Sequence, residues 1–465
     1  MNSFVQAVQS VPMETRTKNG MKTYDSSKNA LVDLFFTIGA SRGKDLSKEF
    51  TRALLQDSTL ALRLLAWARD VRGGAGERDV VRKILLSLEK NYPDQLDRIL
   101  PHLAEFGRWD DLLIFQTKAV KEKAFVLIGN ALRESNGLAA KWMPRQGPLA
   151  AEIRQFFGMS PKFYRKSLVN LTNVVETAMC ANAWPEINYS HVPSLAAARY
   201  QKAFKKHDPV GYEAYKAKLS TGEAKVNANA VYPYDVIKSR AHGGDDKVIQ
   251  AQWDALPDYI GDELVLPVCD VSGSMTCPVG GNKNLTCMDI SVSLGLYLAD
   301  KNKGPFKDMF LTFSEKPKLQ TLKGNLIDKL NQLQRADWGM STNLHGAFEE
   351  ILKYAVKGKV KAEDMPKYVL VMSDMEFNHC AQHDDSAMQM IERKYSDAGY
   401  TVPNIVFWNL NARSGNVPVK FDKKGVALVS GFSPSIMTSI LKAKDLDPTS
   451  VMLETLNSPR YSVIV

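Results

Sequence analysis

The spacing of apolar residues changes once along the chain. From residue 26 to about residue 218, apolar positions recur every three or four residues, which predicts amphipathic helices. Short segments with glycine or proline separate these helices, for example residues 72–76. No strand-like alternation interrupts the pattern. We therefore expect stacked helix pairs, as in an α-solenoid.

After residue 260 the pattern alternates between strands and helices. Apolar runs of strand length occur at 264–269, 309–313, 368–372, 404–408 and 426–429. Helical patterns occur at 288–301, 326–333, 344–354, 385–398 and 433–443. This alternation predicts a doubly wound, mostly parallel α/β sheet with functional loops at the C-terminal ends of its strands.

The predicted fold class is thus α + α/β, with the helical part first. At 465 residues the chain is too long for one ordinary core. We expect an N-terminal arm, a helical domain, a connection and an α/β domain, at residues 1–24, 25–240, 241–260 and 261–465.

Oxygen-bearing side chains follow the apolar runs of the α/β part. Asp270 ends the first run, and Ser272 and Ser274 follow at every second position. Thr342 precedes a helical pattern, and Asp374 ends another buried run. Carboxylate and hydroxyl oxygens suit a hard cation, so these five residues predict a site for Mg²⁺, or for another divalent cation such as Mn²⁺ or Ca²⁺.

The order of these five residues resembles the metal-ion-dependent adhesion site (MIDAS) of von Willebrand factor A domains. The resemblance implies an A-like domain that binds an acidic side chain of a protein partner through the metal ion. The alternative is that the five residues cap strand ends in an unrelated α/β domain.

The motifs of common enzyme classes are absent from the sequence. It contains no Gly-x-Ser-x-Gly elbow, no paired carboxylates with an evident base and no His-x-x-x-His spacing within a predicted helix. We therefore predict binding without catalysis. A Mg²⁺-dependent nuclease is a further alternative, but it lacks a visible general base.

Five cysteines are few and odd in number, and Cys269 lies in a predicted buried strand. This favours a reduced, cytoplasmic protein and argues against a disulfide between Cys277 and Cys287. No uncharged apolar stretch is long enough to span a membrane, and residues 1–20 lack the apolar region of a signal peptide, so we expect neither feature. A second, zinc site is conceivable, although its spacing matches no known zinc knuckle. Its ligands would be Cys277, Cys287, His379, Cys380 and His383.

The positive charge lies in the helical part. Residues 1–250 hold 37 Lys and Arg against 26 Asp and Glu, a net of +11, whereas the remainder has a net of −2. A basic domain of this kind points to a polyanion such as RNA, with no DNA specificity expected. The alternative is that the charge only keeps the domain in solution.

Basic and aromatic residues are interleaved in the second half of the helical part. Cations neutralise phosphates, and exposed rings stack on unpaired bases. Alternatively, Tyr200, Phe204 and Tyr212 lie in the core. The candidate RNA contacts are Lys141, Arg145, Arg165, Lys166, Arg199, Lys202, Lys205, Lys206 and His207.

The segment 68–78 reads ARDVRGGAGER and lacks the Lys-Ser/Thr of a phosphate loop. We expect a turn between helices, with Arg72 and Arg78 exposed and Glu77 in the first turn of the next helix. Together with KWMPR (141–145), FYRKSL (163–168) and VPSLA (192–196), this segment resembles the Ro ribonucleoprotein family, as an uncharacterised Ro-like branch.

Ro-type proteins join a TROVE module, which is a ring of HEAT-like helical repeats, to a von Willebrand factor A domain. The resemblance implies binding of small structured or misfolded RNA without catalysis. The helical part here is shorter, and residues 276–287 form an insertion, so ring closure stays open. The predicted function is an RNA-binding scaffold, and the alternative is a metal-dependent protein adaptor without RNA binding.

Overall fold

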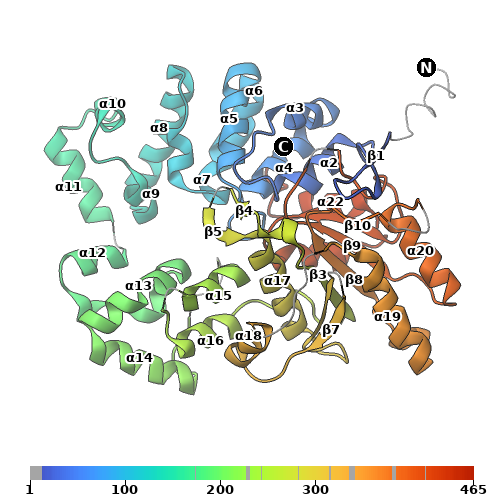
Figure 1. Cartoon of the computed structure of the whole chain (residues 1–465). Coiled ribbons are helices and arrows are strands. Elements are labelled where there is room, and N and C mark those ends of the chain that lie inside the picture. The colour runs from blue at the N-terminus through green and yellow to red at the C-terminus, as the bar shows by residue number, and fades with distance from the viewer. Residues whose placement is uncertain are drawn as a thin grey trace.

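The computed structural model describes residues 13–172, 174–226, 231–241, 243–280, 282–313, 316–334, 341–379, 384–413 and 415–465. An arc of helices leaves the α/β domain, runs outward and returns to it (Figure 1). The predicted fold class is confirmed: a helical part precedes a mostly parallel sheet with helices packed on it.

The first arm of the arc has well-capped, apolar helices. The side chain of Asn29 accepts hydrogen bonds from the N–H groups of Leu31 and Val32, which starts α2. Asp57 caps α4 in the same way, and eight of the twelve residues of α4 are buried. The helices of this arm are α2 (Ala30–Ile38), α3 (Ser47–Gln56), α4 (Ser58–Arg69), α5 (Asp79–Asn91), α6 (Pro93–Ile99), α7 (Leu103–Phe106) and α8 (Lys118–Arg133).

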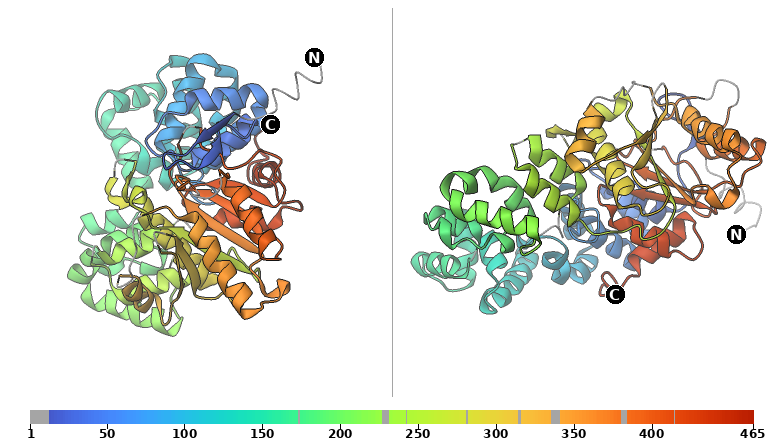
Figure 2. Two further views of the ribbon diagram at one scale, coloured as in Figure 1. Left: turned by 45° about the vertical axis from the view of Figure 1, so that its right-hand side comes forward. Right: turned by 90° about the horizontal axis from the view of Figure 1, so that it is seen from below.

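The second arm turns back toward the sheet and has a small aromatic core of its own. Figure 2 shows this arm as a separate layer of helices beside the sheet. Helices α9 (Gly137–Trp142), α10 (Pro148–Phe156) and α11 (Pro161–Leu171) continue the first arm beyond α8, and most of their buried residues belong to the main core. The second arm consists of α12 (Val175–Cys180), α13 (Ser194–His207), α14 (Pro209–Thr221), α15 (Pro233–Ala241) and α16 (Asp246–Asp254). The connection predicted at residues 241–260 thus contains a helix, α16.

The sheet has six strands in the order β10-β9-β8-β3-β6-β7. All neighbouring strands are parallel except β7, which runs antiparallel to β6 at the edge. The sequence analysis missed β7 because it is short and partly exposed. The strands are β3 (Val265–Asp270), β6 (Met309–Phe313), β7 (Lys318–Thr321), β8 (Tyr368–Ser373), β9 (Asn404–Asn409) and β10 (Val426–Ser430).

Helices from both parts of the chain cover the sheet, as a parallel sheet requires. Helix α17 packs on β3 and α19 packs on β6, while α2 and α22 pack on β10. The first helix of the arc is thus also a covering helix of the sheet. The helices that follow β3 are α17 (Cys287–Lys301), α18 (Leu326–Gln334), α19 (Leu344–Gly358), α20 (Ala387–Asp397), α21 (Met437–Lys442) and α22 (Pro448–Leu456).

The arc closes where its end meets its beginning. The hydroxyl of Tyr232 donates to the carbonyl oxygen of Ala75 at 3.4 Å. Nearby, Arg42 pairs with the fully buried Glu77 at 3.0 Å and lies over the ring of Phe432 at 4.7 Å. Ring closure, left open by the sequence, therefore occurs at this junction.

The glycine-rich turn 70–78 also binds the C-terminal segment. Asp70 is fully buried and accepts hydrogen bonds from Arg460 and from the hydroxyl of Tyr461, the latter at 2.8 Å. Arg72 and Arg78 are exposed, as predicted. Glu77 instead precedes α5 and is buried, because its carboxylate pairs with Arg42 rather than with the helix N-terminus.

Two hairpins complete the described chain. Strands β1 (Glu14–Arg16) and β2 (Lys22–Tyr24) dock on the loops of the sheet, within the predicted N-terminal arm. The insertion after Ser274 forms strands β4 (Pro278–Val279) and β5 (Asn282–Thr286), which lie between the two arms of the arc (Figure 1). Among the described helices, none is long and apolar enough to cross a membrane.

Candidate metal site and basic recess

The two aspartates of the predicted metal site lie at the same edge of the sheet. Strands β3 and β8 are parallel neighbours, with Cys269 opposite Met372. Asp270 ends β3 and Asp374 directly follows β8, and both are buried. The position is the C-terminal end of the central strands, where open α/β sheets bind ligands.

Hydrogen bonds hold the carboxylate of Asp270 in place. One oxygen accepts the N–H of Ser272 at 2.9 Å, and the other accepts the hydroxyl of Ser373 at 2.5 Å. Burial, followed by the charge of Asp374, raises the pKa of Asp270 to about 7. The shift reflects the cost of a buried negative charge at the edge of the sheet where Asp374 also lies.

The predicted hydroxyl residues reach the same edge. The hydroxyl oxygens of Ser272 and Ser274 are 3.0 Å apart. Thr342 lies just before α19, and its carbonyl accepts the N–H of Asn378 from the loop after β8 at 3.1 Å. The structure thus brings the Thr342 segment to the Asp374 loop. Residues 335–340, which include Trp338 of the same motif, lie outside the described part of the chain.

A cation that was not predicted from the sequence also lies at this site. The guanidinium of Arg413 donates to Asp374 Oδ2 at 3.1 Å, and its Nε lies 3.3 Å from Glu376 Oε1. Arg413 follows β9 by four residues, so its place at this edge was open to prediction. The pairing of Arg413 with Asp374 could not be predicted, because the two residues lie on different loops.

The first hairpin also reaches the site. The side-chain amide of Asn19 lies 3.5 Å from the hydroxyl of Thr342 and donates to the carbonyl oxygen of Glu376 at 2.6 Å. The backbone N–H of Lys18 donates to the carboxylate of Glu376. The residues between β1 and β2 therefore form one wall of the site, which no local motif indicated.

The donor set fits a hard divalent cation. All five predicted side chains offer oxygen atoms, and the two carboxylates lie together in a buried setting that favours an added positive charge. Asp270, Ser272, Ser274, Thr342 and Asp374 would hold such an ion, which would supply a positive centre for an acidic oxygen. The guanidinium of Arg413 neutralises part of the negative charge of the two aspartates and would therefore compete with the bound ion.

The predicted zinc ligands are only partly described. Cys380 and His383 lie outside the described residues, and His379 lies 3.6 Å from Asp384. The Sγ atoms of Cys277 and Cys287 are 3.4 Å apart. Contact with the Cys287 thiol lowers the pKa of Cys277 to about 7. Within the described chain, no group of three His, Cys, Asp or Glu residues is arranged to hold a metal ion.

Most of the predicted RNA contacts are exposed, but some have partners. Lys141 pairs with Glu176 at 3.4 Å, and Arg145 donates to the hydroxyl of Thr172 at 3.3 Å. The ring of His207 stacks on Trp184 with centroids 4.5 Å apart. The exposed members of the set are Arg145, Arg165, Lys166, Arg199, Lys202, Lys205, Lys206 and His207.

The rings among these cations are mostly core residues. Phe204 and Tyr212 are buried with Tyr189 and Trp184, and Tyr200 packs against them. Phe204 and Tyr212 therefore cannot stack on bases, and the alternative that placed them in the core is correct, whereas Tyr200 is only partly buried. Phe163 differs, because 59% of it is exposed beside Arg165 and Lys166.

A polar recess of about 490 Å³ lies between α13, α15 and the second hairpin. Arg199 and Lys202 come from α13, Lys238 comes from α15, and Asn282 and Asn284 come from β5. Lys238 pairs with Asp289 at 2.8 Å. Arg199 and Lys202 are exposed, so the recess presents cations and amides that suit a phosphate and its sugar.

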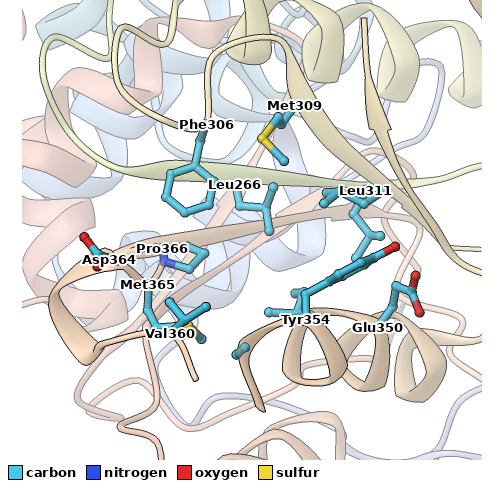
Figure 3. A pocket seen from close by; sticks show the side chains of 13 residues that line it. Leu266, Phe306, Met309, Leu311, Glu350, Tyr354, Val360, Asp364, Met365 and Pro366 are labelled. Atoms are coloured by element: carbon cyan, nitrogen blue, oxygen red, sulfur yellow. The ribbon is translucent and has the colours of Figure 1, made fainter. Parts of the chain in front are cut away.

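A different cavity of about 180 Å³ lies at the opposite end of the sheet, between its strands and α19 (Figure 3). Leu266, Phe306 and Leu311 face Tyr354 across it, and Glu350 lies at one side. Its apolar lining distinguishes it from the oxygen-rich metal site.

Comparison with known proteins identifies the family. A family model described as a domain of unknown function, DUF2828, matches residues 17–141 and 146–263, more than half of the chain. The chain therefore belongs to the DUF2828 family. A second model, also described as a domain of unknown function, DUF7788, matches residues 265–458.

A relative of similar extent occurs in a giant virus. The uncharacterised protein L728 of Acanthamoeba polyphaga mimivirus is 29% identical over 503 aligned residues, covering 95% of this chain and 86% of the viral protein. Among solved structures, the Ro (RSR) protein of Deinococcus radiodurans aligns with a TM-score of 0.46 and 16% identity, over 93% of this chain and 99% of that protein. At this level, the likeness carries no conclusion about function.

Proposed function

We propose that this protein is a non-enzymatic RNA-binding scaffold. The second arm of the helical arc holds RNA, and the site at the edge of the sheet holds a divalent cation that binds an acidic group of a protein partner. The sequence motifs that resemble the Ro family and the excess of positive charge in the helical part support the same proposal.

The observation that carries the RNA part is the cluster of cations on α13. Lys202, Lys205 and Lys206 are exposed, and within the described chain none of them forms an ion pair. From residue 141 to residue 218 the chain has 12 Lys and Arg against 5 Asp and Glu. Unpaired cations beside a polar recess release counterions when they contact phosphates, which drives binding.

The metal part rests on the five oxygen ligands at the edge of the sheet. They favour a second candidate function, a metal-dependent adaptor that binds an acidic peptide and no RNA. The two candidates differ in their response to salt and to chelation. Binding to RNA falls steeply with salt, whereas binding through a metal ion is lost with EDTA.

Fluorescence anisotropy with labelled RNA tests the proposal. The wild type and a Lys202/Lys205/Lys206→Gln variant are titrated against a single-stranded RNA and a hairpin RNA over a series of salt concentrations. The slope of log K against log salt is negative, and we expect its magnitude to be smaller by about 2 in the variant. Each lost phosphate contact removes about 0.7 from this magnitude for a single strand.

A matched control has the same charge change on the sheet domain. Lys318, Lys323 and Lys357 are exposed, and a Lys318/Lys323/Lys357→Gln variant should bind RNA as the wild type does. Equal losses in both variants would mean that only net charge matters and would reject the α13 surface. A folded wild type without any salt-sensitive RNA binding would reject the scaffold in favour of the adaptor.

A further inference from the structure

Two cysteines at the base of the second hairpin face each other. Cys277 directly precedes β4 and Cys287 directly follows β5. The backbone N–H of Cys287 donates to the carbonyl of Cys277 at 3.2 Å, so the two residues are cross-strand neighbours. Their Sγ atoms are 3.4 Å apart.

The surroundings of the pair are polar and differ between the two thiols. The side-chain amide of Asn411 donates to the Sγ of Cys277 at 3.3 Å. Cys277 is partly exposed, whereas Cys287 is buried and its thiol lies 3.7 Å from the carbonyl oxygen of Leu410. A reagent from solution therefore reaches Cys277 first, and Cys287 lies behind it.

We propose that Cys277 and Cys287 form a reversible dithiol–disulfide site, oxidised by a small disulfide such as oxidised glutathione. The Cα atoms of opposed residues in an antiparallel pair lie within the Cα range of a disulfide, so the two sulfur atoms, now 3.4 Å apart, need only a small shift to bond. This inference does not depend on RNA or metal binding.

The reaction proceeds by thiol–disulfide exchange. The sulfur of Cys277 attacks oxidised glutathione, forms a mixed disulfide and releases one glutathione. The sulfur of Cys287 then attacks the Cys277 sulfur of this mixed disulfide and releases the second glutathione. The protein loses two thiol hydrogens, and one oxidised glutathione becomes two reduced molecules.

The consequence is a covalent bond between the end of the metal-site loop and the start of α17. Cys277 lies three residues after Ser274, and Cys287 is the first residue of α17. The hairpin between them carries Asn282 and Asn284 into the basic recess. Oxidation would therefore fix the hairpin that separates the two candidate binding regions.

Intact-mass measurement and peptide mapping of the full chain test the proposal after incubation with oxidised glutathione. In the wild type we expect the loss of two hydrogens, a peptide that links Cys277 to Cys287, and full reversal by dithiothreitol. The Cys287→Ser variant should instead keep one glutathione on Cys277, because the second attacking thiol is missing.

Cys180 provides the matched control, because it is exposed and far from the pair in sequence. The Cys180→Ser variant should form the Cys277–Cys287 link as the wild type does. A folded wild type whose Cys180 reacts while Cys277 and Cys287 both stay free would overturn the proposal. A stable glutathione adduct on Cys277 of the wild type, with Cys287 unreacted, would overturn it as well.

Discussion

The metal-site edge of the sheet and the basic face of α13 differ in how their residues are held. At the metal site, Asp270, Ser272 and Asp374 are buried, and hydrogen bonds fix the carboxylate of Asp270. On α13, Lys202, Lys205 and Lys206 are exposed side chains of one helix. In the proposed function, the first region would be a preorganised site for one ion, and the second would be a surface for a flexible polyanion.

This difference explains why the sequence placed the candidate metal ligands at one edge of the sheet, but did not show which lysines of the helical part are unpaired. In a parallel sheet, the position of a residue after a strand decides its place in space, because all the strands end at one edge. On a helix, the same cationic residue type is either free or paired, and only the neighbouring helix decides which. Lys141 illustrates this, since Glu176 of α12 neutralises it.

The largest expected effect is at the glycine-rich turn 70–78, where Asp70 binds the C-terminal segment. Replacing Asp70 by Ala leaves the guanidinium of Arg460 and the hydroxyl of Tyr461 without their buried partner. We expect the free energy of unfolding to fall by about 3–5 kcal/mol in urea titrations. Asp79→Ala, an exposed control in a surface ion pair, should cost less than about 1 kcal/mol. Equal effects would contradict a structural role for the turn.

The next effect separates the two regions. Asp270→Ala removes one of the two carboxylates, and we expect the affinity for Mn²⁺ or Mg²⁺ to fall by more than ~100-fold, beyond the loss seen for outer partners of metal ligands. Isothermal titration calorimetry measures it, with exposed Asp364→Asn as the control. RNA binding should stay unchanged in both variants. Loss of RNA binding together with metal binding would mean that the regions act as one site.

Arg413 tests the competition between an internal cation and the metal ion. Its guanidinium contacts Asp374, so Arg413→Gln should raise the affinity for the divalent cation by about tenfold through lost repulsion. The Arg16→Gln variant removes the same charge from an exposed ion pair and should change the affinity little. Weaker metal binding in Arg413→Gln would show that the guanidinium instead supports the site.

The smallest effect compares two lysines of the helical arc. Lys202→Gln should reduce the magnitude of the slope of log K against log salt for RNA binding by about 0.7. Lys141→Gln should leave this slope almost unchanged, because Glu176 already neutralises Lys141. Anisotropy titrations at several salt concentrations measure both slopes. An equal fall in both would show that RNA displaces Glu176 from Lys141.

Much of the fold followed from periodicity. Most strands and helices of the α/β part lie within a few residues of their predicted positions, because runs such as 368–372 are long enough and apolar enough to specify a buried strand, but helix α22 was not predicted. The short edge strand β7 and the two hairpins were missed. Their residues are partly exposed and few, so local pattern carries little information about them.

The pattern of residues was enough to predict the order of the helical and α/β parts and to propose five oxygen-bearing side chains for one edge of the sheet, because the ends of strands and helices are local features. Tertiary structure alone decided the rest. It placed Arg413 and Asn19 at the metal site, closed the arc at Ala75 and Tyr232, and brought Cys277 against Cys287. These contacts depend on how separate elements pack, and packing is set by the whole chain rather than by any one segment.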